Sequence, residues 1–121
     1  MKAIPSIFIL AGALIVSAPA RAQQNTDLGR FEYEKGCIGC HGVDSKGSGI
    51  HMPRLKNDPP DLTLLAKANG GVFPIEKIYD AIDGRAQFQD HGVREMPIWG
   101  KEFTTPEMIS LLDYLNRIQQ K

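Results

Sequence analysis

The sequence carries no excess of charge of either sign, because its 121 residues include 14 basic and 14 acidic side chains. Binding to nucleic acid requires a basic face on the protein, so this balance argues against a nucleic-acid partner. Nor is there the surplus of lysine that would predict an acidic partner from net charge. The overall charge therefore points to no partner of opposite charge.

Long hydrophobic runs are also missing. The apolar run at residues 7–16 is ten residues long, about half of the roughly 20 residues that a membrane-spanning helix needs. It follows Lys2 and leads to Ala20-Arg21-Ala22, a pattern typical of a cleaved secretory signal peptide. We expect residues 1–22 to be removed, which leaves residues 23–121 as one small domain; an uncleaved membrane anchor is the alternative. The mature chain would carry 12 basic and 14 acidic residues, a net charge of −2.

Cysteine is scarce, with only Cys37 and Cys40 in the whole chain. A disulfide between them would suit an exported protein, but it would close a loop too short to add much stability. A thioredoxin-like redox pair needs a βαβ context, and no alternating strand pattern surrounds Cys37. A zinc site would need distant histidines to complete its four ligands. The adjacent His41 favours another interpretation, because C-x-x-C-H is the signature of covalent haem c attachment.

The chemistry of attachment explains the spacing of this motif. Two thiols add across two vinyl groups on one edge of the porphyrin, so their sulfur atoms must lie a short, fixed distance apart. His41 would then lie beneath the iron as its proximal ligand. Haem c is attached outside the cytoplasm, which agrees with the predicted export signal. We therefore expect one covalent haem c in a protein of the bacterial periplasm, with no membrane anchor after cleavage of the signal.

Local signals predict a mostly α-helical domain. Residues 42–60 show no periodicity, and a loop of this length is unusual in a compact domain unless it wraps a cofactor. Apolar spacing and the usual capping residues define the expected helices. These are a helix from about Asp27 to Gly36, one from Leu62 to about Asn69 after the N-cap Asp61, one at residues 75–83 ended by Gly84, and a last helix from about Thr105. Thr104 and Glu107 can form a capping box at the start of the last helix.

The spacing Gly29-x-x-x-Tyr33-x-x-x-Cys37-x-x-Cys40-His41 resembles class I cytochromes c. The resemblance implies the all-α cytochrome c fold, in which N- and C-terminal helices cross. Gly29 would permit the close approach of the helices, and Tyr33 and Tyr114 would pack at the crossing. In similar cytochromes a proline twelve residues after the histidine offers its carbonyl to the histidine ring. Here that position is Pro53.

The stretch Met96-Pro97-Ile98-Trp99-Gly100 resembles the distal-ligand segment of bacterial class I cytochromes c. The resemblance implies that Met96 supplies its thioether to the iron and that Trp99 packs near the haem edge. His91, five residues before Met96, is the rival ligand. The haem propionates need donors, for which Arg85 and Trp99 are preferred; Arg94 and Lys56 are the other candidates.

Ligation by His41 and Met96 saturates the iron and leaves no position for a substrate. The resemblance therefore implies a single-electron carrier, not an enzyme, that docks transiently with a dehydrogenase, an oxidase or another cytochrome. The alternative is a dedicated cytochrome subunit that accepts electrons within a periplasmic dehydrogenase complex. A third possibility is a haem sensor or a peroxidase-like protein whose distal ligand is labile.

Overall fold

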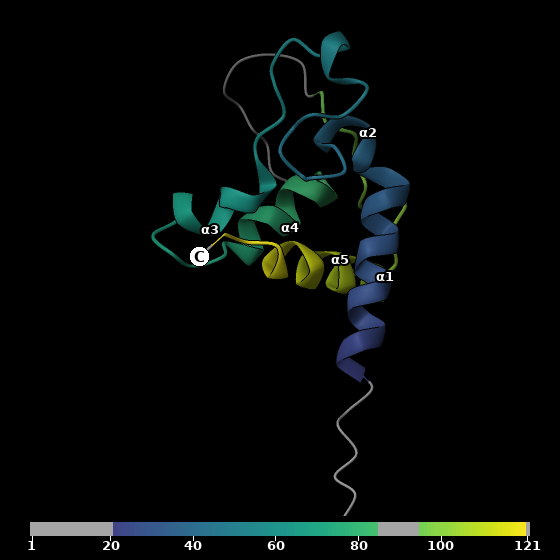
Figure 1. The fold of residues 1–121 in the computed structure, drawn as a ribbon. Coiled ribbons are helices and arrows are strands. Elements are labelled where there is room, and N and C mark those ends of the chain that lie inside the picture. Colours follow the sequence, from purple (N-terminus) through teal and green to yellow (C-terminus); the bar gives the residue numbers. More distant parts are fainter. Residues whose placement is uncertain (1–20, 85–94, 121) are drawn as a thin grey trace, which may run out of the picture.

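The computed structural model describes residues 21–84 and 95–120, and within these ranges the chain is helical and has no strand. Its elements are α1 (Arg21–Gly36), α2 (Ile38–His41), η1 (Met52–Arg54), η2 (Leu62–Leu64), α3 (Leu65–Ala68), α4 (Ile75–Asp83) and α5 (Thr105–Arg117) (Figure 1). This arrangement confirms the all-α fold. In these ranges no helix combines the length and the apolar character needed to cross a membrane. Residues 1–20 of the predicted signal peptide lie outside the described residues.

The helices agree with the local sequence signals, with one difference at the N-terminus. Helix α1 begins at Arg21 and not near Asp27, because residues 21–24 are good helix formers. Asp61 caps the predicted helix at residues 62–69, which the structure divides into η2 and α3; its side chain accepts a hydrogen bond of 2.8 Å from the Thr63 amide. Gly84 ends α4 in the left-handed conformation, with a φ of 93°.

The beginning of α5 is fixed by the predicted capping box. The Glu107 carboxylate accepts hydrogen bonds from the Thr104 backbone amide and hydroxyl, each 2.7 Å long. These bonds hold the pKa of Glu107 below its ordinary value. The opposite end of α5 is tied to η2 and α3, because the Gln119 side chain donates to the Leu62 carbonyl and accepts from the Ala66 amide.

Helices α1 and α5 cross (Figure 1), and Gly29 lies where their backbones come closest to each other. A Cβ atom at Gly29 would overlap the carbonyl oxygen of Ser110 and would lie 2.8 Å from the Cβ of Tyr114. Only glycine therefore allows the two backbones to come so close. One turn later the rings of Tyr33 and Tyr114 pack at a centroid distance of 5.5 Å. The crossing and its residues agree with the resemblance to class I cytochromes c.

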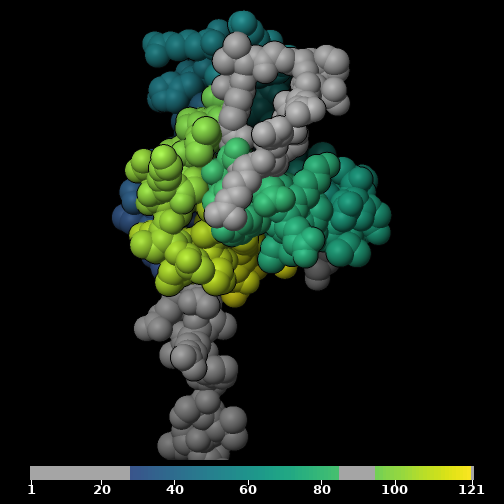
Figure 2. All heavy atoms as spheres, turned by 180° about the vertical axis from the view of Figure 1, so that it is seen from behind, coloured from purple at the N-terminus to yellow at the C-terminus, as the bar shows by residue number. Residues whose placement is uncertain are grey.

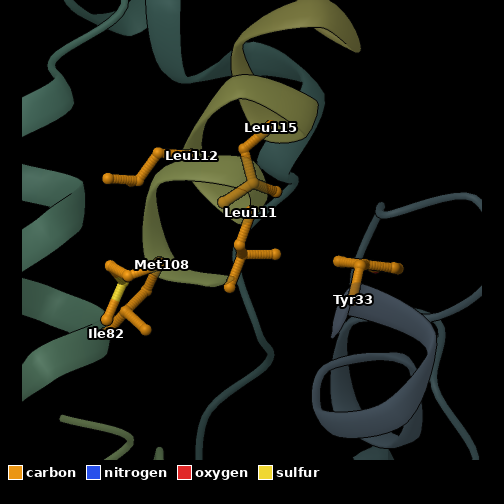
Figure 3. Packing of buried hydrophobic residues seen from close by; sticks show 6 residues of the cluster. All are labelled: Tyr33, Ile82, Met108, Leu111, Leu112 and Leu115. Atoms are coloured by element: carbon orange, nitrogen blue, oxygen red, sulfur yellow. The ribbon is translucent and has the colours of Figure 1, made fainter. Parts of the chain in front are cut away.

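The buried core lies where α5 packs between α1 and α4. Helix α5 contributes four residues at helical spacing, α1 contributes Tyr33, and α4 contributes Ile82 (Figure 3). The four from α5 are Met108, Leu111, Leu112 and Leu115. In the space-filling view of Figure 2, residues 62–84 (teal to green) and residues 95–104 (yellow-green) lie at opposite sides of α5. The core therefore supports two separate segments, and both contribute to the site described below.

Substitution of Gly29 by alanine tests the crossing. Helix propensity alone would make alanine about 1 kcal/mol more favourable than glycine in a helix. The overlap with Ser110 predicts the opposite sign, a destabilisation of about 1–3 kcal/mol. Urea unfolding followed by circular dichroism measures the difference. Glu34→Ala, on the exposed face of α1, is the control and should change the stability by less than about 0.5 kcal/mol. A Gly29→Ala protein more stable than the wild type would contradict the close crossing.

Candidate functional site

A cavity of about 370 Å³ brings together the residues that the sequence singled out. Cys37, Cys40, His41 and Met96 all line it, and its walls are mostly apolar. Its volume lies within the range of about 300–1,000 Å³ that is usual for small-molecule and cofactor sites. Met96 is distant in sequence from the other three residues, so this meeting is a result of the fold. Tyr33 and Trp99 line the same cavity.

The end of α1 delivers the two cysteines and His41 as one helical turn. The Cys37 amide donates to the Tyr33 carbonyl at 2.8 Å, and the His41 amide donates to the Cys37 carbonyl at 2.9 Å. Residues three and four positions apart share a face of a helix. The C-x-x-C-H spacing therefore places both thiols and the imidazole on one side of this turn, which we call the Cys37–His41 turn.

The following loop folds back onto the Cys37–His41 turn. Backbone amides of Gly47, Gly49 and His51 donate to the carbonyls of His41, Cys40 and Gly39, at 2.8, 3.1 and 2.8 Å respectively. Glycine is needed at position 49, because a Cβ there would overlap the Gly39 carbonyl. The loop thus satisfies the carbonyl groups at the end of the turn and holds its backbone in place.

The Cys37 thiol lies in surroundings that suppress its ionisation. Burial, followed by the charges of Cys40 and Glu32, raises the pKa of Cys37 to about 12. A redox-active thiol pair requires a lowered pKa, since the thiolate is the reactive form. Both cysteines are free of disulfide bonds. The thioredoxin-like alternative therefore does not match the electrostatics of this site.

His41 is buried, and its surroundings favour the neutral imidazole. Burial lowers the pKa of His41, and a contact with the backbone of Pro60 offsets part of this effect. The neutral ring is the form that binds a metal ion. Its Nδ1 atom is buried without a hydrogen bond of normal geometry to any described residue. Because proline has no N–H group, the group that Pro60 presents to the ring is its carbonyl.

The resemblance to class I cytochromes c implies that the carbonyl beside the His41 ring belongs to Pro53, but in the structure it belongs to Pro60. Pro53 lies in η1, is exposed, and does not line the cavity, whereas Pro60 does. The reason is the path of the loop: residues 47–51 are already paired with the Cys37–His41 turn. The backbone of Pro60, later in the same loop, lies beside the His41 ring. In the structure the carbonyl beside His41 therefore comes from Pro60. The Pro59-Pro60 pair directly before the N-cap Asp61 was the only sequence signal for this position.

Residues 95–100, which we call the Met96 segment, are attached at both ends. The Trp99 amide donates to the Ile82 carbonyl at 3.0 Å, and the Gly100 amide donates to the Asp83 carbonyl at 3.2 Å. At the other end, the Glu95 carboxylate accepts from the backbone amides of Lys56 and Asn57. These bonds hold the pKa of Glu95 below its ordinary value. No local pattern around Glu95 predicts this contact.

Trp99 closes one wall of the cavity. Its ring stacks on Phe103 with a centroid distance of 5.5 Å and an interplanar angle of 22°. A Cβ at Gly36 would lie 3.0 Å from the Cη2 atom of Trp99, so the glycine that ends α1 also makes room for the indole. Trp99 is thus fixed between α1 and the beginning of α5.

The remaining candidates are less well placed. Arg85, His91 and Arg94 lie outside the described residues. Lys56 is exposed, and the structure does not place it in the lining of the cavity. In the part of the chain that the structure describes, no three His, Cys, Asp or Glu residues form a group that could hold a metal ion.

Comparison with known families decides the class of the protein. Residues 24–115 match the family model described as cytochrome c oxidase, cbb3-type, subunit III. The chain belongs to this family of cytochrome c domains. The class I cytochrome c identified from its motifs is thereby confirmed, and the family indicates haem-based electron transfer. The comparisons with curated proteins and with solved structures returned no match.

The residues at the cavity fit the haem c of a cytochrome c domain. Two thiols and a neutral imidazole share one face of the Cys37–His41 turn, and a thioether reaches the same mostly apolar cavity. A buried polar atom without a partner is costly and normally marks a place that another group completes. The Nδ1 atom of His41 is such an atom among the described residues.

Substitution of Tyr33 by phenylalanine tests the support of the Cys37–His41 turn. The Tyr33 hydroxyl donates a buried 2.7 Å hydrogen bond to the carbonyl of Gly42, the residue after His41, and burial raises the pKa of Tyr33 to about 12. The Gly42 carbonyl keeps a second donor, the Ser45 amide at 3.2 Å, so losing the hydroxyl removes one of two hydrogen bonds and should cost about 1 kcal/mol.

The measurement is the free energy of unfolding of the haem-loaded protein in urea. Tyr79→Phe in α4 is the matched control, because the structure records no hydroxyl hydrogen bond from Tyr79 to another described residue. Its effect should stay below about 0.5 kcal/mol. Equal effects of the two substitutions would refute the role of the Tyr33 hydroxyl.

Proposed function

We propose that the chain is a periplasmic single-electron carrier with one haem c, held covalently by Cys37 and Cys40 and ligated axially by His41 and Met96. The observation that carries the proposal is that Met96 and the Cys37–His41 turn line the same cavity. The chain has a single C-x-x-C-H motif, which supports one haem. Haem c, when bound, supplies an iron that alternates between the ferrous and ferric states.

Each residue of the site has a distinct task in this proposal. His41, kept neutral by burial, donates a ring nitrogen to the iron, and the Pro60 carbonyl orients the ring, as hydrogen-bond acceptors commonly do for ligating histidines. The Met96 thioether favours the reduced state and raises the potential relative to two histidines. With both axial positions taken, substrates have no access to the iron.

The apolar walls exclude water from the site. Trp99, Ile82 and Leu115 line the cavity from the Met96 segment, α4 and α5. Exclusion of solvent lowers the local dielectric and strengthens the influence of each nearby charge on the potential. Arg85 remains our predicted donor to a haem propionate, together with Trp99.

Export and partners complete the proposal. We infer that residues 1–22 are cleaved and that residues 23–121 act in the bacterial periplasm without a membrane anchor. The carrier would exchange electrons with a dehydrogenase, an oxidase or another cytochrome by transient docking. We expect it to bind no nucleic acid. The cytochrome c domain itself implies a redox partner protein.

The description of the family as an oxidase subunit favours a second candidate function. In this alternative the chain is a lasting subunit of a redox enzyme complex, such as a periplasmic dehydrogenase. Gentle purification of the tagged chain from its own cells distinguishes the two. Recovery as a free monomer supports the carrier, whereas recovery in a fixed ratio with an enzyme supports the subunit.

Substitution of Met96 by alanine tests the distal ligand. The ferric wild type should show a sulfur-to-iron charge-transfer band, and its ferrous form should bind carbon monoxide slowly. Met96→Ala should lose the band and bind carbon monoxide readily, because an axial position becomes open. Met52→Ala, a half-buried methionine that does not line the cavity, is the control and should keep the band. Absence of the band in the wild type would exclude ligation by methionine.

Removal of the attachment thiols tests the dependence of the fold on haem. A domain of this size buries only a modest fraction of its surface, and without haem the cavity of about 370 Å³ lies between the core and the surrounding segments. We expect the Cys37→Ser, Cys40→Ser double variant, prepared free of haem, to show no sharp thermal transition by circular dichroism. The haem-loaded wild type, measured in the same buffer, should melt cooperatively. A native-like, cooperative melt of the haem-free variant would show that the core is sufficient for folding.

A further inference from the structure

Glu95 joins two segments that are far apart in the sequence. Its carboxylate accepts hydrogen bonds from the backbone amide of Lys56, from the backbone amide of Asn57 at 3.2 Å, and from the Asn57 side chain at 3.4 Å. Hydrogen bonds to an ionised acceptor are about twice as strong as bonds between neutral groups. Two consecutive amides pointing at one carboxylate therefore form a defined attachment point for Glu95.

The loop that holds Glu95 also reaches the other side of the iron site. Asn57, Pro60 and Glu95 all line the cavity, and the Pro60 carbonyl faces the His41 ring. Residues 56–60 thus contact both proposed axial ligands or their neighbours. The Pro60 carbonyl lies beside His41, and the amides of Lys56 and Asn57 bind Glu95, the residue directly before Met96. Glu95 is the point at which the proximal-side loop and the Met96 segment are joined.

The attachment of Glu95 complements the one at the far end of the Met96 segment. The Trp99 and Gly100 amides bind carbonyls at the end of α4. Glu95 provides the corresponding attachment immediately before Met96. Because Pro97 follows Met96 and restricts the backbone on that side, fixing Glu95 limits the positions that the Met96 thioether can reach.

We propose that Glu95 is a positioning residue for Met96, which holds the thioether in place through its bonds to the backbone amides of Lys56 and Asn57. This inference rests on the proposed function, because it assumes that Met96 ligates the iron. Breaking the attachment should increase the fraction of protein in which the thioether has left the iron by about tenfold or more, as expected for the loss of hydrogen bonds to a charged group.

The experiment compares Glu95→Ala and Glu95→Gln with a variant of equal charge change. Glutamine keeps the shape and one acceptor oxygen, so its effect should lie between those of the wild type and Glu95→Ala. Glu102→Gln is the matched control, because Glu102 is exposed in the neighbouring turn and the structure records no side-chain hydrogen bond from it to another described residue. All variants are studied as haem-loaded protein.

Three measurements are made on each variant. Amide hydrogen exchange at Lys56 and Asn57 reports whether the hydrogen bonds to Glu95 are lost, independently of ligation; it should accelerate by about tenfold or more in Glu95→Ala. The intensity of the sulfur-to-iron band should fall, and carbon monoxide should bind the ferrous form faster by a similar factor. Glu102→Gln should match the wild type in all three.

The outcomes separate this inference from the proposed function. A wild type without the sulfur-to-iron band would refute ligation by Met96, whatever the Glu95 variants do. A wild type with the band, together with Glu95 variants whose band and carbon monoxide binding are unchanged, would overturn the role of Glu95 alone, even if amide exchange accelerates. Equal effects of Glu102→Gln would also overturn it, because they would show an effect of charge and not of position.

If Glu95→Ala does not fold, the comparison rests on Glu95→Gln, whose side chain has nearly the same shape as that of glutamate.

Discussion

The close contact between the backbones of α1 and α5 at Gly29 is the constraint on which the rest of this protein depends. Because α1 crosses α5 there, Tyr33 is buried one turn later and the Cys37–His41 turn begins one turn after that. On α5, the same crossing directs Leu111 into the core and Leu115 toward both core and cavity. A small change in the separation of the two helices would move the Cys37–His41 turn relative to the opposite wall of the cavity.

The protein has a core on one side of the cavity and connecting segments on the other. Helices α1, α4 and α5 form a packed unit in which six buried apolar side chains contact one another. The segments at residues 42–60 and 95–100 are instead held mainly by hydrogen bonds and by the surfaces that line the cavity. This division places the segments without periodic structure on the side of the cavity opposite the core.

The sequence predicted those features that depend on a few neighbouring residues. Gly84 predicts where α4 ends, and Thr104 with Glu107 predicts where α5 begins, because helix caps act within one turn. The Cys37–His41 turn follows from its spacing. The carbonyl beside His41 could not be predicted in this way, because it depends on the path of the whole loop at residues 42–60, which brings Pro60 to the ring. Glu95 looks like any surface carboxylate in the sequence, and its partners are 38 and 39 residues away.

The pairing of residues 47–51 with the Cys37–His41 turn has a consequence for the rate of electron transfer. The carbonyls of Gly39, Cys40 and His41 each accept a backbone hydrogen bond from this loop, which restrains the peptide dipoles around His41, the iron ligand proposed above. Dipoles that are already fixed add little to the reorganisation energy of a redox reaction, in the same way that preorganised dipoles lower the cost of charge development in enzymes. In the proposed carrier, a loop without periodic structure thus holds the backbone around His41 in place, which favours rapid electron exchange at a small driving force.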